Sequence, residues 1–289
     1  MGFSVASGLI LLPRTPAKLI NPRRYEFKGV DQISARDKSI YEHEAVFIPD
    51  IYRPFVKNPP SLEGIAARFA GLRTLEQIAA FAATYGLLGV QQPLTGAERL
   101  SMVAPRYGPA PYEPLHVWES HIKEIRQLLL LYRALDRRKR GLESFIEPDL
   151  IEVEEDHGLL VAWSIEPETQ TRFLPILLDS YESEEKTAFI VLAERIKAGL
   201  RDAINLDYSS VMETSNSRLG FRILEVRTTP YLLAAIYYDL WQIITDNRAI
   251  IACENCGLPL ERSGRKRFCN NACRQAAYRK RKNRLKEGS

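Results

Sequence analysis

The sequence predicts an α+β protein, a helix-rich N-terminal body followed by a small C-terminal module. Two observations predict the body: apolar residues recur at helical spacing behind capping residues, and shorter apolar runs lie between prolines and glycines, as is typical of strands. A third predicts the module, since all four cysteines of the 289-residue chain lie within residues 253–273. We therefore divide the chain into a strand- and loop-rich section (1–60), a helix-dominated body (61–250) and a cysteine module (251–289).

The first elements are short. Residues 9–12 and 45–48 are apolar runs, and each is a strand candidate. Ser61 follows two prolines and is a candidate N-cap for a short helix that ends near Phe69. The 45% hydrophobic content supplies enough apolar side chains for these elements to pack on a common core, which argues against disorder over most of the chain.

Two clearer helices follow. Thr74 and Gln77 have the spacing of a capping box, which opens a helix that Gly86 is expected to end. After a loop rich in Pro and Gly, the spacing predicts a long helix over 115–136, closed by the cations of 137–140. One continuous apolar stripe marks it: Trp118, Ile122, Ile125, Leu129 and Tyr132.

The rest of the body alternates between the two types of element. Residues 159–165 and 219–226 are predicted strands, and 184–203 is a predicted helix. Thr229 and Pro230 have the sequence of an N-cap and first helical residue, so we expect a helix from there to residue 247. The side chains expected in the core include Phe221, Ile223, Leu224 and the tryptophans Trp118, Trp163 and Trp241.

The charge of the chain is unevenly distributed. The net charge is only +4, from 40 Lys and Arg against 36 Asp and Glu. Residues 253–289 hold eleven of those cations and three of the acids, a net charge of +8, so the remainder of the chain carries −4. The chain therefore combines a mildly acidic body with a strongly basic tail.

The cysteines follow the pattern Cys253-x2-Cys256-x12-Cys269-x3-Cys273. Zn²⁺ takes four such ligands in a tetrahedron, and nothing in the sequence suggests redox chemistry that would favour iron–sulfur or copper. Gly257 can adopt the positive φ that a turn behind the second thiolate needs, and Asn270 or Asn271 can cap a helix that carries the second pair. We predict one structural zinc ion, because four protein sulfurs leave no position for water.

The residues around these cysteines resemble a known pattern. Residues 253–259 and 267–281, with the sequence Phe268-Cys269-x3-Cys273-Arg274, resemble the treble-clef and zinc-ribbon ends of many bacterial proteins. They are similar in layout to CGNR-type zinc fingers, which close stress-linked transcription regulators, with Ala-Cys-Arg-Gln (272–275) where that type has Cys-Gly-Asn-Arg. Residues 81–89 resemble a motif of uncharacterised bacterial proteins that also end in a zinc module. The resemblance implies a treble-clef-like fold, metal binding and, by analogy, nucleic-acid binding.

The basic tail predicts a polyanionic partner. From Arg279 onward, cations face nearly every side of the expected helix, so that end must project into solvent. We expect nucleic acid, DNA in the first place, with about five phosphate contacts and a slope of log K on log salt of roughly −4 to −5. Tyr278 is placed to stack on a base. The candidate contact residues are Arg265, Lys266, Arg267, Arg274, Tyr278, Arg279, Lys280, Arg281, Lys282, Arg284 and Lys286.

Other interpretations of the sequence stay open. The tail could be a solvated segment, or it could dock on the acidic body or on an acidic protein partner. The body could bind a protein partner or a small ligand. No catalytic constellation is recognisable: the histidines are scattered and the acidic run of 152–156 is expected to be a solvated turn, although catalytic residues can converge from distant positions. These histidines are His43, His116, His121 and His157.

The sequence also bears on location. It contains no apolar run of the ~18 residues that a membrane span needs, and no charged and apolar leader typical of export. We therefore expect no membrane partner and a cytoplasmic protein whose thiols stay reduced.

Overall fold

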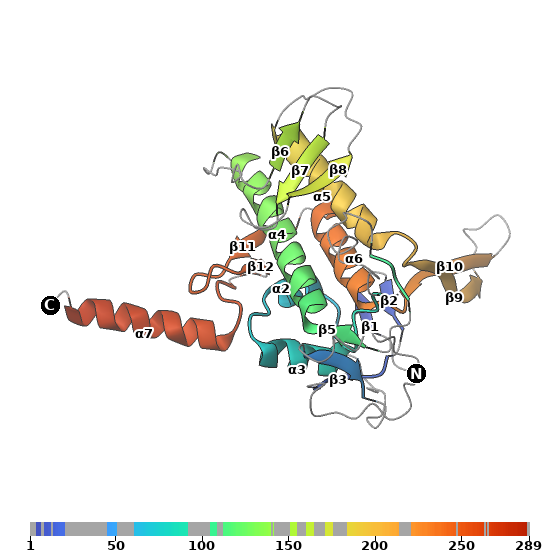
Figure 1. Cartoon of the computed structure of the whole chain (residues 1–289), viewed down its shortest axis with the longest axis horizontal. Coiled ribbons are helices and arrows are strands. Elements are labelled where there is room, and N and C mark those ends of the chain that lie inside the picture. The colour runs from blue at the N-terminus through green and yellow to red at the C-terminus, as the bar shows by residue number, and fades with distance from the viewer. Residues whose placement is uncertain are drawn as a thin grey trace, which may run out of the picture.

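The structure is a computed structural model of the whole chain (Figure 1). It describes residues 4–6, 9–12, 14–20, 45–50, 61–91, 105–108, 112–139, 141, 151–154, 160–164, 171–175, 184–213, 221–246, 248–262, 264 and 266–287. The helices are α2 (Ile65–Ala70), α3 (Leu75–Tyr85), α4 (Leu115–Lys139), α5 (Glu184–Leu200), α6 (Leu232–Thr245) and α7 (Asn271–Glu287). The strands are β1 (Ser4–Ala6), β2 (Leu9–Leu11), β3 (Ala17–Ile20), β4 (Val46–Pro49), β5 (Glu113–Pro114), β6 (Ile151–Glu154), β7 (Leu160–Ser164), β8 (Thr171–Pro175), β9 (Asn205–Glu213), β10 (Phe221–Thr229), β11 (Ile250–Ala252) and β12 (Pro259–Glu261).

The core lies among α4, α5 and α6, and α2 and α3 extend it. In Figure 1, α4 and α6 run through the centre of the molecule. Every residue of α6 from Leu232 to Leu240 is buried, because neighbouring elements cover this apolar helix on all sides. The predicted stripe of the long helix is buried as expected: Trp118, Ile122, Ile125, Leu129 and Tyr132.

Trp118 of α4 is the centre of an aromatic cluster that joins three elements. Its ring centroid lies 4.9 Å from that of Phe47 on β4, 6.1 Å from Phe69 on α2 and 6.5 Å from Phe81 on α3. Each contact is tilted or edge-on, the arrangement that aromatic rings prefer. The cluster holds β4, α2 and α3 against α4.

The strands form small separate sheets. One has the order β1-β2-β10-β9, another β3-β4-β5, a third β6-β7-β8, and β11 and β12 form a hairpin. In the first, β2 pairs in parallel with the end of β10, with Leu9 opposite Arg227. The strand predictions for 9–12, 45–48, 159–165 and 219–226 are confirmed as β2, β4, β7 and β10. The structure is thus a mixture of helix and strand, as predicted.

The capping box of α3 is present. The hydroxyl of Thr74 accepts from the Gln77 backbone N–H at 3.4 Å, and the Gln77 side chain accepts from the Thr74 N–H. Gly86 ends the helix with φ of 84°. A side chain at Gly86 would also meet the Thr15 carbonyl oxygen, so glycine is needed for both the conformation and the close approach.

The prediction that Ser61 caps α2 is wrong. Ser61 accepts a hydrogen bond from the Glu63 N–H within a turn, and the helix begins at Ile65 with Gly64 as its N-cap. The cap residue supplies no side-chain acceptor, and the distant Asp239 carboxylate accepts from the N–H groups of Gly64 and Ala66 at 3.4 Å and 2.9 Å instead. A tertiary carboxylate therefore replaces the local cap.

The predicted start of α6 is also wrong by a few residues. Thr229 continues β10 and pairs with Leu11 of β2, so its backbone stays extended. Its hydroxyl accepts from the Tyr231 N–H at 3.1 Å, and the helix starts at Leu232. Strand pairing with the N-terminal segment delays the helix past Pro230.

Two smaller expectations also change. Trp241 is 36% exposed and does not fill the core, whereas the side chain of Trp163 lies outside the described residues. The acidic run begins on strand β6, which includes Glu152 and Glu154, so it is not simply a turn.

Strand β9 has a polar sequence that gave no strand signal, and it forms by antiparallel pairing with β10. The burial of Phe221, Ile223 and Leu224 lies outside the described residues.

Candidate metal centre and basic helix

Two local structures present the cysteines. Cys253 and Cys256 lie in the turn between β11 and β12, and Cys269 and Cys273 lie just before and inside the first turn of α7. The Glu254 N–H donates to the Arg267 carbonyl at 3.1 Å, which joins the two pairs through the backbone. The predicted placement of one pair in a turn and the other at a helix start is confirmed.

The four sulfurs lie close enough to share one ion. All four Sγ atoms lie within 4.8 Å of one another. The Sγ of Cys269 lies 3.4 Å from that of Cys273 and 3.7 Å from that of Cys256. A tetrahedral Zn²⁺ with bonds of about 2.3 Å needs sulfurs about 3.8 Å apart. The cluster is thus positioned to hold a metal ion with small adjustments.

Backbone geometry prepares the first pair. Gly257 has φ of 76°, as predicted, and its N–H donates to the Cys253 carbonyl at 2.9 Å. The Cys253 N–H in turn donates to the carbonyl of Leu258 at 2.9 Å. These bonds close a tight turn in which the N–H groups of Asn255 and Cys256 donate to the Cys253 sulfur.

The second pair depends on a helix cap. The Asn270 side-chain oxygen accepts from the Cys273 N–H at 2.8 Å, which makes Asn270 the capping residue. The helix that follows begins at Asn271. Its first turn carries the Cys273 sulfur, so the positive end of the helix dipole lies beside the cluster.

Burial and hydrogen bonds act in opposite directions on the thiols. Burial disfavours the thiolate of Cys253, but the N–H groups of Cys269, Cys256 and Asn255 donate to its sulfur and lower its pKa to about 6. Burial raises the pKa of Cys256, and burial together with the neighbouring thiols raises that of Cys269 well above its ordinary value. A divalent cation would offset the repulsion among four thiolates, as metal binding normally does.

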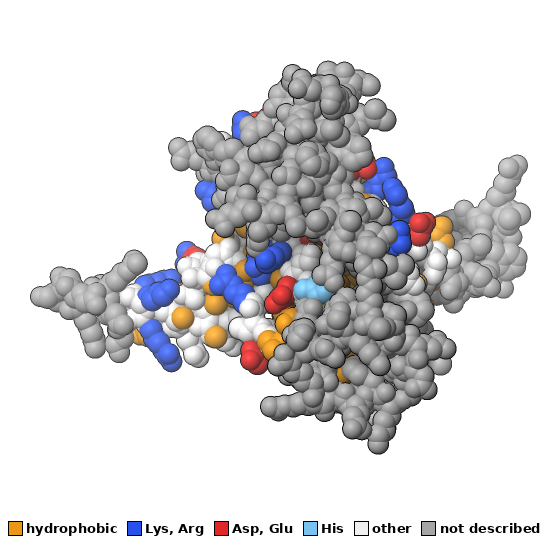
Figure 2. Space-filling model, viewed as in Figure 1, with side chains coloured by type: hydrophobic (Ala, Val, Ile, Leu, Met, Phe, Trp, Pro, Cys, Tyr) orange, Lys and Arg blue, Asp and Glu red, His pale blue; other side chains and the backbone are white. Residues whose placement is uncertain are grey.

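Helix α7 extends away from the rest of the molecule and ends at its far left edge in Figure 1. Figure 2 shows Lys and Arg side chains along its described part. Tyr278 is 69% exposed. The exposed cations near the cysteines are Lys266, Arg267, Arg274, Arg279, Lys280 and Arg281. Arg265 and the side chains of Lys282, Arg284 and Lys286 lie outside the described residues.

One carboxylate holds two of the candidate contact residues. Glu254 pairs with Arg267 at 2.7 Å and with Arg281 at 3.4 Å. Arg281 lies on the third turn of α7, so the pair orients that helix relative to the turn that holds Cys253. All three side chains are substantially exposed, so the pairs direct the helix more than they stabilise it.

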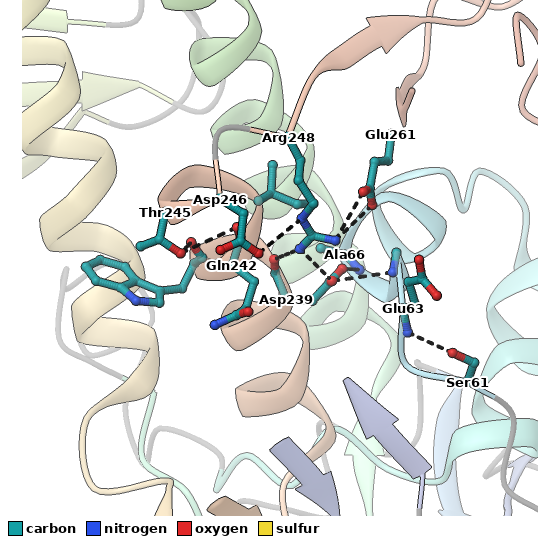
Figure 3. Close-up of polar contacts among 12 residues, drawn as sticks. Ser61, Glu63, Ala66, Asp239, Gln242, Thr245, Asp246, Arg248 and Glu261 are labelled. Carbon is teal, nitrogen blue, oxygen red and sulfur yellow. Dashed lines mark hydrogen bonds and ion pairs between the residues drawn. The ribbon is translucent and has the colours of Figure 1, made fainter. Parts of the chain in front are cut away.

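A polar junction joins the module to the body (Figure 3). Arg248 donates to the Asp239 carboxylate at 3.3 Å and to its backbone carbonyl at 3.1 Å. The same guanidinium donates to Glu261 of β12 at 3.1 Å. Since Asp239 also accepts from Gly64 and Ala66, the junction connects α6, the start of α2 and the module hairpin.

Apolar contacts and one further arginine complete this attachment. Ile250, at the start of β11, belongs to the main core, and Leu258 and Leu260 are buried. Arg73, which precedes α3, donates to the Cys256 carbonyl at 2.9 Å. The body therefore holds the turn of the first cysteine pair in place.

Sequence reasoning missed these supporting residues. Asp239 lies on the apolar helix α6, and a charge in such a helix was a signal that it has a buried partner. Arg73 and Arg248 carry no comparable signal. The partner of Arg73 lies 183 residues away in sequence. The partners of Arg248 lie 9 and 13 residues away, in elements whose packing the sequence does not reveal.

Among the residues that the structure describes, the cysteine cluster is the only group of three or more His, Cys, Asp or Glu side chains arranged to hold a metal. His121 instead lies 3.5 Å from Glu124, a buried carboxylate that pairs with the buried Arg195. His43 and His157 lie outside the described residues. Within the part of the chain described, none of the helices combines the length and apolar character needed to cross a membrane.

Comparison of the chain with protein-family models, curated proteins and solved structures gives no match. The treble-clef assignment and the resemblance to CGNR-type proteins therefore stay predictions.

Proposed function

We propose that this chain is a nucleic-acid-binding protein, with DNA as the first candidate, whose C-terminal module is built on one structural zinc ion. Cys253, Cys256, Cys269 and Cys273 would hold the ion. Zinc supplies folding free energy rather than chemistry there, because four thiolates leave no open coordination position. The resemblance to the zinc modules of bacterial regulators agrees with this role.

The projection of α7 supports nucleic-acid binding most directly. Its exposed side from Arg274 to Arg281 carries four cations, and Tyr278 stands among them. Packing this helix on the body would stabilise it little, because its cations would lose their hydration. Binding to nucleic acid would replace that hydration with ionic contacts to phosphates. The cysteine cluster and the Asn270 cap fix its first turn, so the basic face is presented from a rigid base.

The test neutralises three exposed cations of α7 together: Arg274→Gln, Arg279→Gln and Lys280→Gln. Binding of a short duplex DNA is measured by fluorescence anisotropy at about 50 mM and about 200 mM salt. Loss of three phosphate contacts should make the slope of log K on log salt less steep by about 3 and weaken binding at 0.1 M salt by roughly two to three orders of magnitude.

The matched control removes three exposed cations elsewhere on the body: Lys123→Gln, Lys139→Gln and Lys186→Gln. It makes the same change in net charge and should keep the slope and affinity of the unmodified chain. An equal loss of DNA affinity in both triple variants would show that only net charge matters and not the position of the cations. No DNA binding by the unmodified chain would refute the proposal.

A second candidate function is a protein-interaction module that docks an acidic partner. The observation in its favour is that Glu254 already pairs with two of the module's arginines, Arg267 and Arg281. Under this function a protein complex, and not DNA binding, would be lost when the cations of α7 are neutralised. The α7 triple variant therefore separates the two candidates.

A further inference from the structure

A groove runs between the C-terminal end of α4 and the cysteine module. Its volume is about 760 Å³, and β11 forms one wall. The body contributes Arg133 and Arg137 from the last turns of α4, and the module faces them with its own cations. Of the residues that the structure describes, five cations line it: Arg133, Arg137, Arg262, Lys266 and Arg267.

The groove is strongly positive. Against its five cations stand two carboxylates, Asp136 and Glu254, and Glu254 is engaged by Arg267 and Arg281. Burial and the nearby charge of Arg137 lower the pKa of Arg133, as expected where like charges gather. Such a groove attracts an anion.

The groove is continuous with the basic helix. Lys266 and Arg267 line it and immediately precede the Cys269 ligand and α7. Glu254, on its rim, pairs with Arg281 of α7. The cations of α4, those of the loop before Cys269 and those of α7 therefore lie on connected parts of one surface.

We propose that this groove binds the phosphate backbone of the nucleic acid that α7 engages, so that Arg133 and Arg137 of the body contact phosphates together with the module. The inference rests on the proposed function and extends it, because the acidic body then contributes directly to the interface. Phosphate contacts of this kind position a protein on the duplex and carry no base sequence. The site is thus expected to raise affinity equally for unrelated sequences.

The test replaces both arginines of α4, Arg133→Gln with Arg137→Gln, and measures duplex DNA binding at the same two salt concentrations. Removing two phosphate contacts should make the slope of log K on log salt less steep by about 2. The control is Lys123→Gln with Lys186→Gln, the same charge change on described surface outside the groove. A second pair, Arg133→Lys with Arg137→Lys, keeps the charge and should restore most of the slope.

The outcomes separate the inference from the proposed function. An unchanged slope in the Gln pair, with a reduced slope in the α7 triple variant, refutes phosphate binding by the groove and leaves the proposed DNA binding by α7 in place. A slope reduced as much by the Lys pair as by the Gln pair, or by the control pair, also overturns it, because the loss then does not follow the groove charge. No DNA binding by the unmodified chain overturns both. Thermal unfolding of each variant shows that the fold is retained.

Discussion

Gly257 shows how a single residue limits the metal centre. Its φ of 76° suits glycine, and a Cβ built there meets nothing within 4 Å. Substitution would therefore act through backbone strain alone, because there is no neighbour to displace. Because the residue lies directly after the metal ligand Cys256, backbone strain at Gly257 would lower the affinity of the site for the metal.

We expect Gly257→Ala to cost about 1 kcal/mol, which weakens zinc binding about fivefold. Gly257→Asn should cost less, since asparagine tolerates the left-handed region better. Competition with a chromogenic chelator measures both affinities. Equal affinities for all three proteins would mean that the turn does not depend on this conformation.

Asp239 is a charged residue that is buried inside the body. Burial raises the pKa of its carboxyl, although the hydrogen bonds from Ala66, Arg248 and Gly64 oppose that shift. The folded state therefore holds this proton more tightly than the unfolded state does, for which 3.8 is the ordinary value. The stability that protonation adds is present below the unfolded pKa and is lost as the pH rises through the folded pKa.

The predicted consequence is a pH-dependent difference between the unmodified chain and Asp239→Asn. The free energy of unfolding of the unmodified chain, minus that of the variant, should fall as the pH rises from about 4 through the folded pKa. Urea unfolding at several pH values measures it. A difference that rises over that range would show that the hydrogen bonds outweigh burial and that the folded pKa is lowered.

Helix α7 illustrates how an element is positioned. Its sequence has no apolar face to hold it on the body. Its first turn is held by the Asn270 cap and the cysteines, and Ala277 in its second turn is buried. Near its third turn the exposed pair of Arg281 with Glu254 adds direction. Order in this helix should therefore decrease from its first turn outward.

Asn270→Ala should destabilise the start of α7 by about 1 kcal/mol, because the Cys273 N–H loses its acceptor. Amide hydrogen exchange of residues 273–276 should accelerate about fivefold with zinc present. Asn270→Asp retains an acceptor and serves as the control. An unchanged rate of amide exchange in the Ala variant would show that the metal alone orders the first turn of α7.

The molecule as a whole joins the module to the body through Ile250, Leu260 and the Arg248 junction. Metal binding should therefore stabilise more than the module. The packed helices of the body do not contain a ligand, so they should survive loss of the metal while their contacts with β12 weaken.

We expect Cys273→Ser to abolish stoichiometric zinc binding and to unfold the hairpin and α7 while the body stays folded. Metal analysis should give one zinc per unmodified chain, and circular dichroism should show a loss confined to the module. Ala272→Ser, at the adjacent exposed position, is the control and should keep the metal. Retention of zinc by the Cys273 variant would contradict the four-cysteine centre.

Local patterns were sufficient for much of this protein. Helical periodicity predicted α4 and its buried stripe, the capping box predicted α3, and ligand spacing predicted a cysteine cluster in a turn and at a helix start. Each of these signals lies within a few residues of the structure that it specifies, because capping, periodicity and metal chelation are local.

The tertiary structure decided what depends on residues distant in sequence. Asp239 caps α2 from another helix, β2 holds Thr229 in a strand, and Arg133 and Arg137 face the module across the groove. None of these contacts has a local signature, because each forms only when separate elements pack. The uneven charge and the four cysteines mark the basic module in the sequence; the folded chain alone places two arginines of the acidic body beside it.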